Sequence, residues 1–276
     1  MSRRNRLDFN VLNSFGVELD CISEAAATTV AMDNGFTNVH AAPPTITTPD
    51  AFGGRWLYTH TAAANQEMQT HTTNEIFQFV QGQPIWFHGR LLLGPTTPEE
   101  ENVFLGCMNA FATAPVVDAG AGPKATGDHF GFYTPEAGGT VFAAADDDMW
   151  IAVSQHNGTE IRTVLNAENS LDRQDHRAYA AGPGAGIEAD FEADFVPTGP
   201  IGGTGGVTIF DADIEFHING RTVAVHHHSA GAGGGIAITV ANTTLMNFGL
   251  ALQNTAAATT AILSRMGCHQ RYDVRE

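Results

Sequence analysis

The sequence predicts an all-β protein, an antiparallel sandwich or jelly roll, and three observations support this class. Short runs of strand character follow one another from residue 75 onwards, with turn signals every ~8–15 residues. Thirty Gly and 12 Pro in 276 residues favour turns over long helices. No long amphipathic helical period interrupts these runs. Many short strands separated by turns are typical of two sheets packed face to face.

The clearest element is a β-hairpin over residues 210–225, FDADIEFHINGRTVAV. From Phe210 to Ile218, apolar residues alternate with acidic residues and a histidine, as in a strand with one buried and one wet face. Asn219-Gly220 is the pair best able to adopt the two positive φ angles of a type I′ turn. Thr222–Val225 supplies the return strand.

The other expected strands are rich in β-branched and aromatic residues and are bounded by turn signals. In chain order they are Glu75–Val80, Ile85–Leu93, Val103–Ala110, Asp128–Tyr133, Trp150–Ser154, Thr159–Val164, Ile187–Phe195, Ile236–Val240, Leu245–Gln253 and Ala261–Ser264. We therefore assign a sandwich domain to residues 75–276.

Residues 1–74 have a different composition, rich in Ala, Thr, Asn and Pro with scattered single aromatics. This pattern predicts an extended, mostly irregular N-terminal arm that packs along a partner surface or around its own domain. The basic cluster near the start suggests an anchor, although a short solvated tail is the commoner meaning of such a cluster. The residues expected to contact a partner are Arg3, Arg4, Arg6, Phe9, Phe15, Trp56 and Tyr58.

Charge and cysteine content exclude several classes of function. The formal net charge of −17 repels phosphates, so we expect no nucleic-acid partner. No apolar run approaches ~18 residues, so we expect no membrane span, and the start lacks the apolar stretch of a secretory signal. The three cysteines, Cys21, Cys107 and Cys268, lie far apart in sequence, which favours a reducing cytoplasm over a disulfide framework.

The strongest enzymatic candidate is Glu188-Ala189-Asp190-Phe191-Glu192, because alternate residues of a strand share one face. Retaining glycosidases carry a similar Glu-x-Asp-x-Glu strand, with nucleophile and acid ~5–5.5 Å apart. The acidic alternation continues to Asp194, beyond what catalysis needs, and only three tryptophans could line a sugar cleft. We therefore favour the wet face of an amphipathic strand and predict no catalytic residues.

A second acidic row, Asp211, Asp213 and Glu215, is expected on a neighbouring strand. Carboxylates that face one another across strands repel, so they need compensation. Three alternatives remain: solvation with arginines such as Arg90, Arg162 or Arg221, docking to another subunit, or binding of a cation such as Ca²⁺. We predict no dedicated cofactor or metal.

His226-His227-His228 invites a metal-binding interpretation, since the first and third histidines share one face of a strand. No carboxylate or cysteine stands at a supporting local spacing. We therefore expect a surface strand end there, with adventitious metal or a pH-sensitive contact as alternatives.

From about Glu75 to its end the chain resembles a group of tailed-phage virion proteins with a concanavalin A-like (LamG-like) jelly roll. The resemblance rests on short structural motifs: Glu75–Val80, Pro84–Arg90, Phe104–Gly106, Asp128–Phe132, Ile214–Gly220, Met246–Gln253 and Tyr272–Glu276.

This resemblance implies a non-enzymatic decoration, or cement, protein that binds the outside of a phage capsid and stabilises it. The implied partner is the major capsid protein, and a homo-oligomer, with a trimer as one form, is expected on the virion surface after synthesis in the host cytoplasm. Two alternatives stay open. One is a lectin-like module that binds surface glycans. The other is a retaining glycosidase that uses Glu188 and Glu192.

Overall fold

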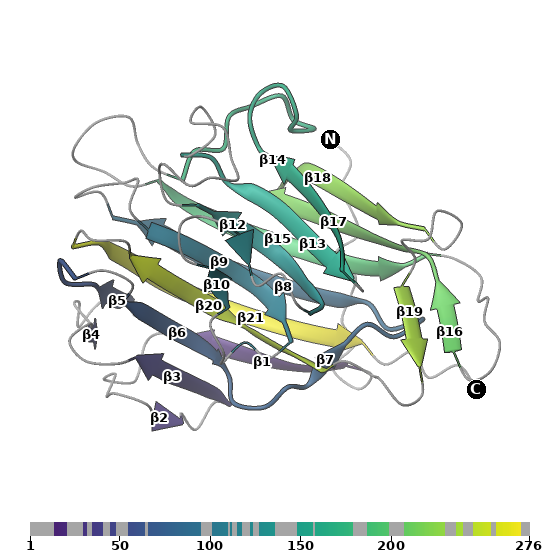
Figure 1. Ribbon diagram of the computed structural model, residues 1–276, viewed down its shortest axis with the longest axis horizontal. Helices are drawn as coiled ribbons and strands as arrows, with labels where there is room; N and C mark the ends of the chain where they lie inside the picture. Colours follow the sequence, from purple (N-terminus) through teal and green to yellow (C-terminus); the bar gives the residue numbers. More distant parts are fainter. Residues whose placement is uncertain are drawn as a thin grey trace.

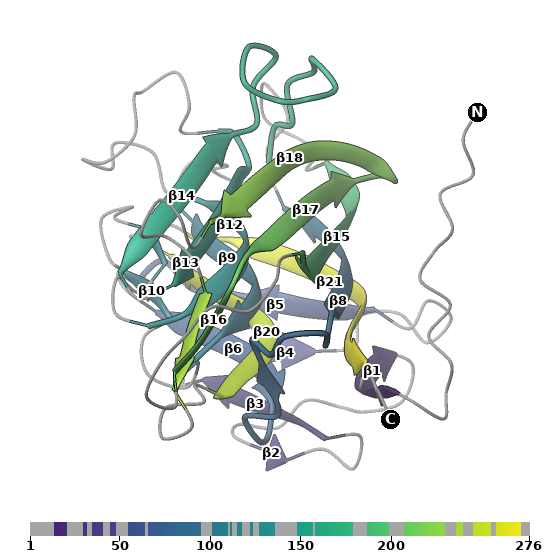
Figure 2. The same ribbon diagram turned by 90° about the vertical axis from the view of Figure 1, so that its right-hand side faces the viewer.

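The computed structural model describes a β-sandwich in two layers (Figures 1 and 2). The residues that it describes are 14–20, 30–31, 35–40, 45–47, 55–63, 66–94, 101–109, 111, 115–117, 122–123, 127–135, 148–156, 158–178, 187–198, 207–229, 236–239, 245–254 and 258–271. All strand pairs in these ranges are antiparallel, which confirms the predicted all-β class. No helix among the described residues is long and apolar enough to cross a membrane.

The first layer, sheet A, joins strands from both ends and the middle of the chain. Its spatial order is β18 (Arg221–His228), β17 (Ala212–Ile218), β15 (Glu188–Pro197), β8 (Ile85–Leu93), β21 (Thr260–Arg271), β5 (Trp56–Thr59) and β4 (Thr45–Thr47), and β1 (Ser14–Asp20) also pairs with β21. Burial alternates strictly along β8 and along most of β15, so one face of sheet A is core and the other is outer surface.

The second layer, sheet B, is buried on both faces along its central strands. Its order is β14 (Thr159–Val164), β13 (Ile151–His156), β12 (His129–Thr134), β9 (Glu101–Met108), β20 (Leu245–Asn254), β6 (Glu67–Thr72), β3 (Phe36–His40) and β2 (Val30–Ala31), and β7 (Phe77–Gln78) also pairs with β20. Two short pairs lie outside the sheets: β10 (Val116–Val117) with β11 (Gly122–Pro123), and β16 (Val207–Phe210) with β19 (Ile236–Thr239).

The main core lies between the sheets and is dominated by phenylalanine. Phe87 of sheet A packs against Phe132 and Phe248 of sheet B, with ring centroids 6.4 and 5.4 Å away. A second cluster covers the other face of sheet B, where Phe111 and Val116 pack on residues such as Phe104. Burial of that face explains why β9 shows no polar alternation in the sequence.

The predicted hairpin is confirmed as β17 and β18. Asn219 and Gly220 have φ angles of 52° and 74°, both positive as a type I′ turn requires. Ala212, Ile214, Phe216 and Ile218 are buried as expected. The pairing shifts register between Phe216 and His217, so the hairpin carries a bulge that the sequence pattern does not reveal.

The predicted N-terminal arm is wrong in part, because several segments of residues 1–74 are strands of the sandwich. β1, β4 and β5 belong to sheet A, and β2, β3 and β6 belong to sheet B. Trp56 and Tyr58 are 1% and 0% exposed and belong to the main core, so they cannot contact a partner. Phe15 is partly buried and stacks on Phe77 with ring centroids 5.5 Å apart. Residues 1–13 lie outside the described residues.

Two other elements differ strongly from their predicted bounds, whereas most strands are shifted by one or two residues. The expected strand Glu75–Val80 shrinks to β7, because Val80 turns back in an isolated bridge to Gln83. The expected strand Ala261–Ser264 lengthens to the whole of β21, in which Arg265 and Gly267 interrupt the apolar period that marks a strand. The predicted closing strand Tyr272–Glu276 lies outside the described residues.

Two cysteines that lie far apart in sequence meet inside the core. Cys107 on β9 and Cys268 on β21 are free thiols, fully buried, with Sγ atoms 3.7 Å apart across the two sheets. Burial, followed by the neighbouring thiol, raises the pKa of Cys268 well above its usual range. Because both residues are fully buried, the two sulfurs pack in the core as small apolar groups.

We expect iodoacetamide at pH 8 to leave Cys107 and Cys268 unmodified in the native protein, because alkylation needs an accessible thiolate. Both should react within the same time once denaturant unfolds the chain. Peptide mapping by mass spectrometry measures each site separately. Native-state alkylation of either cysteine at the unfolded rate would contradict the buried placement.

Candidate functional site

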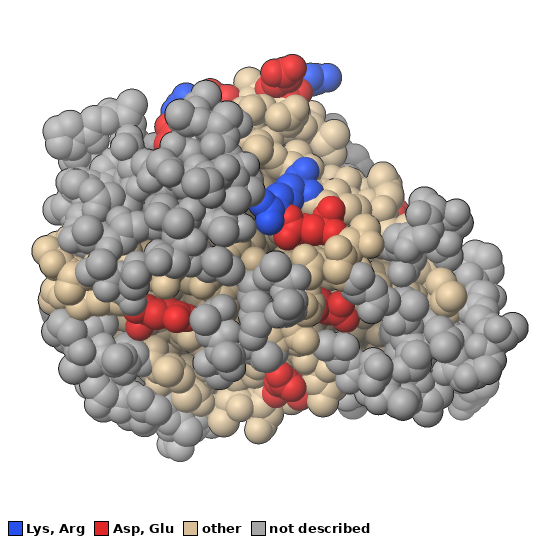
Figure 3. Space-filling model, in the orientation of Figure 1, with Lys and Arg blue, Asp and Glu red and all other residues tan. Residues whose placement is uncertain are grey.

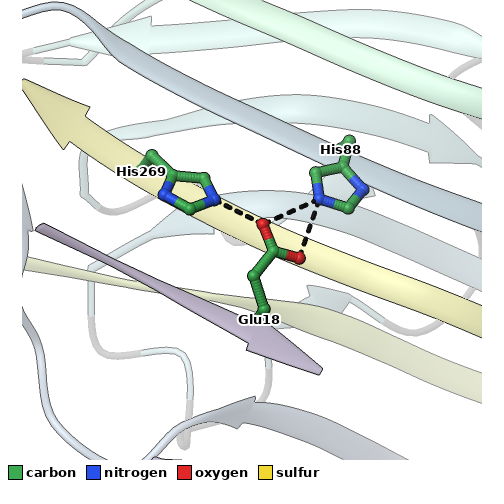
Figure 4. A group of neighbouring side chains, drawn as sticks. All are labelled: Glu18, His88 and His269. Carbon is green, nitrogen blue, oxygen red and sulfur yellow. Dashed lines mark hydrogen bonds and ion pairs between the residues drawn. The ribbon is translucent and has the colours of Figure 1, made fainter. Parts of the chain in front are cut away.

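The outer face of sheet A brings together three side chains from distant parts of the sequence. Glu18 comes from β1, His88 from β8 and His269 from β21, and both imidazole rings point towards the Glu18 carboxylate (Figure 4). His88 and His269 are largely buried at 14% and 22% side-chain exposure, whereas Glu18 is half exposed at 51%. The three side chains form a compact cluster that is open to solvent on one side.

Strand register places these residues side by side. Gly267 of β21 lies opposite His88 on one side and opposite Glu18 on the other. Because Gly267 has no side chain, the Glu18 carboxylate lies across it and reaches His88. His88 Nε2 donates to Glu18 Oε1 and Oε2 at 3.1 and 3.0 Å, and His269 Nε2 donates to Oε1.

Two glycines make room for the cluster. A Cβ atom at Gly267 would lie 2.3 Å from Glu18 Oε2, and one at Gly16 would lie 2.0 Å from His269 Nδ1. Both separations are far below van der Waals contact. Any larger residue at either position would therefore displace a member of the cluster.

Trp86 adds a third ring beside the two imidazoles. Its ring centroid lies 4.8 Å from that of His88, two residues along β8, and 5.5 Å from that of His269 across the strand pair. The indole is tilted by 31° to the His88 ring and stacks on the His269 ring with an interplanar angle of 25°. The partly exposed indole therefore holds both imidazoles in orientation, and the outer face gains an aromatic patch.

Opposing effects set the charge of Glu18. Burial opposes its ionisation, but hydrogen bonds from His269 and His88 outweigh burial and lower the pKa of Glu18 to about 2. The carboxylate is therefore ionised and acts only as an acceptor for both N–H groups.

The predicted acidic patch lies on this same face, with its members distributed over β15 and β17. Glu188, Asp190, Glu192 and Asp194 alternate outward along β15, and Asp194 pairs directly opposite Glu215. Asp213 also lies on β17, and Asp211 lies between β16 and β17. The predicted adjacency of the two acidic rows therefore holds for the members on β15 and β17, but Asp211 lies outside these strands.

Cations from neighbouring strands compensate this acidic patch. Arg90 donates to Glu188 at 2.8 Å and Arg55 lies 3.7 Å from it, so the Arg90 hydrogen bond lowers the pKa of Glu188. Arg265 approaches Asp190 at 3.4 Å. Of the suggested arginines, Arg90 fits, whereas Arg162 lies on sheet B paired with Glu160. Arg221 is exposed at the start of β18.

Histidines also contact the patch, which the sequence did not suggest. His217 Nε2 lies 3.3 Å from Asp194 and 3.7 Å from Glu215. His227 Nδ1 lies 2.7 Å from Asp213. Imidazole rings therefore lie among the carboxylates of this face.

The predicted surface position of the histidine run is wrong for two of its three members. His226 and His228 point into the sandwich and are 1% and 2% exposed. Ser154 Oγ lies 2.8 Å from His226 Nδ1 and 2.9 Å from His228 Nε2. β18 continues to His228, so the alternation of a strand turns these two rings inward. Of the three, His227 faces the solvent.

Four predicted contact residues are not among the described residues. Arg3, Arg4, Arg6 and Phe9 fall outside the described residues, so capsid anchoring through them stays a prediction. In the view of Figure 3 the described acidic and basic side chains that are visible form small, separate groups. The suggested Ca²⁺ site in the acidic patch also stays a prediction. Within the described ranges, the side chains that converge closely enough for an ion are Glu18, His88 and His269.

The Glu18–His88–His269 cluster is the part of the site that the sequence did not reveal. Glu18 and His269 are separated by 251 positions, and each residue alone resembles an ordinary polar residue of a strand. The one local signal is the Trp-x-His spacing on β8, which places two rings on one face. That spacing by itself does not identify a site.

The chain is similar to known proteins in its structure but not in its sequence. No protein-family model matches the chain, and no curated protein sequence matches it. Lectin II from Ulex europaeus matches with a TM-score of 0.52 and 8% identity over 94% of this chain and 99% of the lectin. An endo-1,3-beta-glucanase from Streptomyces sioyaensis matches with a TM-score of 0.51 and 11% identity over 94% and 97%.

The carbohydrate recognition domain of Emp47p is similar to the same extent, with a TM-score of 0.50 and 9% identity over 94% of this chain and 97% of that domain. At these identities the likeness establishes the architecture alone. The chain therefore has the concanavalin A-like jelly-roll fold of lectins and glucanases, which confirms the fold that the sequence resemblance implied.

Proposed function

We propose that this protein is a carbohydrate-binding module of the lectin type, which binds a glycan on the outer face of sheet A around Trp86. The observation that carries the proposal is the aromatic patch of Trp86, His88 and His269 bordered by carboxylates. Asp194 pairs directly opposite Trp86, and Glu18 bonds both imidazoles. The neighbours in fold include a lectin and a carbohydrate recognition domain.

The chemistry of this face suits a sugar. The C–H groups of a sugar ring pack on aromatic side chains, and its hydroxyl groups donate to carboxylates. A binding face of this kind combines apolar contact area with a few fixed polar groups that set orientation. Trp86 provides the contact area, and Asp194 and Glu18 provide the acceptors.

The surroundings of Glu188 do not suit the general acid of a retaining glycosidase. A retaining glycosidase needs a carboxylic acid whose pKa is raised, so that it can protonate the leaving group. The hydrogen bond from Arg90 lowers the pKa of Glu188 instead, which keeps this carboxylate ionised. Glu188 is therefore unsuited to act as the general acid.

A glycan array at millimolar calcium, followed by calorimetric titration of the best ligand, tests the proposal. We expect Trp86→Ala to weaken glycan binding at least tenfold, because it removes the central ring of the patch. Leu92→Ala is the matched control, on the same strand and face but away from the ring cluster. No ligand on the array, or equal binding by the wild type and the Trp86→Ala variant, would refute the proposal.

A further inference from the structure

We propose that Glu18, His88 and His269 bind a divalent transition-metal ion of the Zn²⁺ type on the outer face of sheet A. The site goes beyond the carbohydrate proposal, because it concerns an ion held by the protein's own side chains and is measured without any glycan.

The ligand atoms are already close to the separations that such an ion needs. One atom from each of the three side chains lies within 4.8 Å of the other two. A tetrahedral ion with bonds of about 2.0–2.2 Å separates neighbouring ligands by about 3.3 Å. His88 Nε2 lies 3.1 and 3.0 Å from the two Glu18 oxygens, so a small outward rotation of the side chains opens the space.

The same nitrogen of each ring faces the centre of the cluster. Both Nε2 atoms converge on Glu18, as Figure 4 shows. Without an ion, each Nε2 carries a proton that it donates to the carboxylate. A metal ion takes the place of those protons, with neutral imidazoles and an ionised carboxylate as ligands. Each side chain therefore keeps its place in the cluster when the ion replaces the protons.

The scaffold holds the ligands on rigid elements. All three come from neighbouring strands in fixed register, with Gly267 between Glu18 and His88. Trp86 stacks beside both imidazoles and restricts their rotation. Gly16 and Gly267 clear the space that His269 and Glu18 occupy. Strand-borne ligands supported by such neighbours are a property of well-formed metal sites.

The donor set selects the kind of ion. Two imidazole nitrogens and one carboxylate oxygen suit Zn²⁺, Co²⁺ or Ni²⁺, whereas Ca²⁺ and Mg²⁺ prefer oxygen ligands alone. Three protein ligands leave a fourth coordination position, as in open zinc sites. Glu18 is half exposed, so that position faces solvent and the ion has a path of entry.

Calorimetric titration of ZnCl₂ into EDTA-treated full-length protein tests the inference, with native mass spectrometry to count bound ions. We expect one high-affinity Zn²⁺ per chain and no comparable binding of Ca²⁺. His88→Gln and Glu18→Gln should each weaken Zn²⁺ binding at least 100-fold. The visible spectrum of bound Co²⁺ should show tetrahedral intensity in the wild type and lose it in both variants.

Two further variants distinguish an ion at this cluster from an ion bound elsewhere on the same face. Gly267→Ala keeps all three ligands but places a Cβ where the Glu18 carboxylate lies, so it should weaken Zn²⁺ binding at least tenfold. His227→Gln removes the exposed histidine beside Asp213 and should leave Zn²⁺ binding unchanged. Circular dichroism of each variant without metal checks that the fold is intact.

The inference is overturned if the wild type binds no Zn²⁺ at 100 µM, or if folded His88→Gln binds as tightly as the wild type. It is equally overturned if His227→Gln abolishes binding, since the ion would then lie at the other edge of the sheet. Glycan binding is scored separately with Trp86→Ala, so either proposal can fail while the other holds.

Discussion

Replacing Gly106 by alanine is expected to destabilise the folded protein strongly. Gly106 lies in the middle of β9, opposite Gly131 of β12 and Gly249 of β20. A Cβ atom at Gly106 would lie 2.3 Å from the Phe130 carbonyl oxygen and 2.6 Å from the Gly131 Cα. These are backbone atoms, which no rotamer change can move away. Overpacking of a core costs about 1–3 kcal/mol and occasionally more, and we expect a loss above ~3 kcal/mol here.

The midpoint of urea unfolding, measured at equal protein concentration, provides the comparison. Gly158→Ala is the control, because Gly158 has a positive φ of 75° but nothing within 4 Å of its Cβ position. That control should cost only the backbone strain of an alanine at positive φ, about 1 kcal/mol. Equal midpoints for the two variants would show that the three strands do not approach so closely at their glycines.

Much of this architecture follows from local patterns in the sequence. β8 and β14 begin and end at the predicted residues, because each has a clear period and clear flanking turns. Asn219-Gly220 adopts the two positive φ angles of a type I′ turn, as this residue pair predicts. Patterns of this kind show which residues of a strand face the core and which face solvent. They therefore predict a strand correctly where one of its faces is exposed to solvent.

The strands before residue 75 escape prediction for a physical reason. β5 is only four residues long, so Trp56 and Tyr58 provide a single repeat of the strand period. Its other residues, Leu57 and Thr59, are only partly buried at the edge of the core. The aromatic pair is the one available signal, and the surrounding Ala, Thr and Pro residues indicate irregular structure instead.

In the candidate site, too, local patterns predict some residues and miss others. Glu188, Asp190 and Glu192 are predicted to share a face because they lie on one strand, and they do. Glu18 and His269 meet only because β1 pairs with β21, at opposite ends of the described sequence. Local periodicity contains no information about which strands become neighbours, so an alternating pattern cannot predict a site built across strands.

Stability should fall as the pH is lowered from 6.5 to 4.5, because His226 is buried in its neutral form. Burial, followed by the neighbouring His228 and His227, lowers the pKa of His226 to about 3. In the unfolded chain its pKa is about 6.5, so below that pH the unfolded state binds a proton that the folded state does not. Each pH unit then costs up to ~1.4 kcal/mol from this group, or ~2–3 kcal/mol over the window. His129 is shifted in the same direction by burial, to about 4, and adds to the loss.

The contacts of His226 make its neutral form the stable one. Ser154 Oγ lies 2.8 Å from its Nδ1 and Thr163 Oγ1 lies 3.1 Å from its Nε2, and either hydroxyl can donate or accept. A neutral ring therefore satisfies both partners, whereas a second proton would place a charge between the sheets beside Phe216.

His226→Gln should lower stability at pH 7 but flatten its decline between pH 6.5 and 4.5. His227→Gln, one residue away and exposed, should keep the slope of the wild type. Urea unfolding at half-unit pH steps measures both slopes. A His226→Gln variant with the wild-type slope would show that the loss comes from other groups. The lowered pKa of Glu18, about 2, cannot account for it, because the stability linked to that carboxylate is lost only as the pH falls below ~4.5.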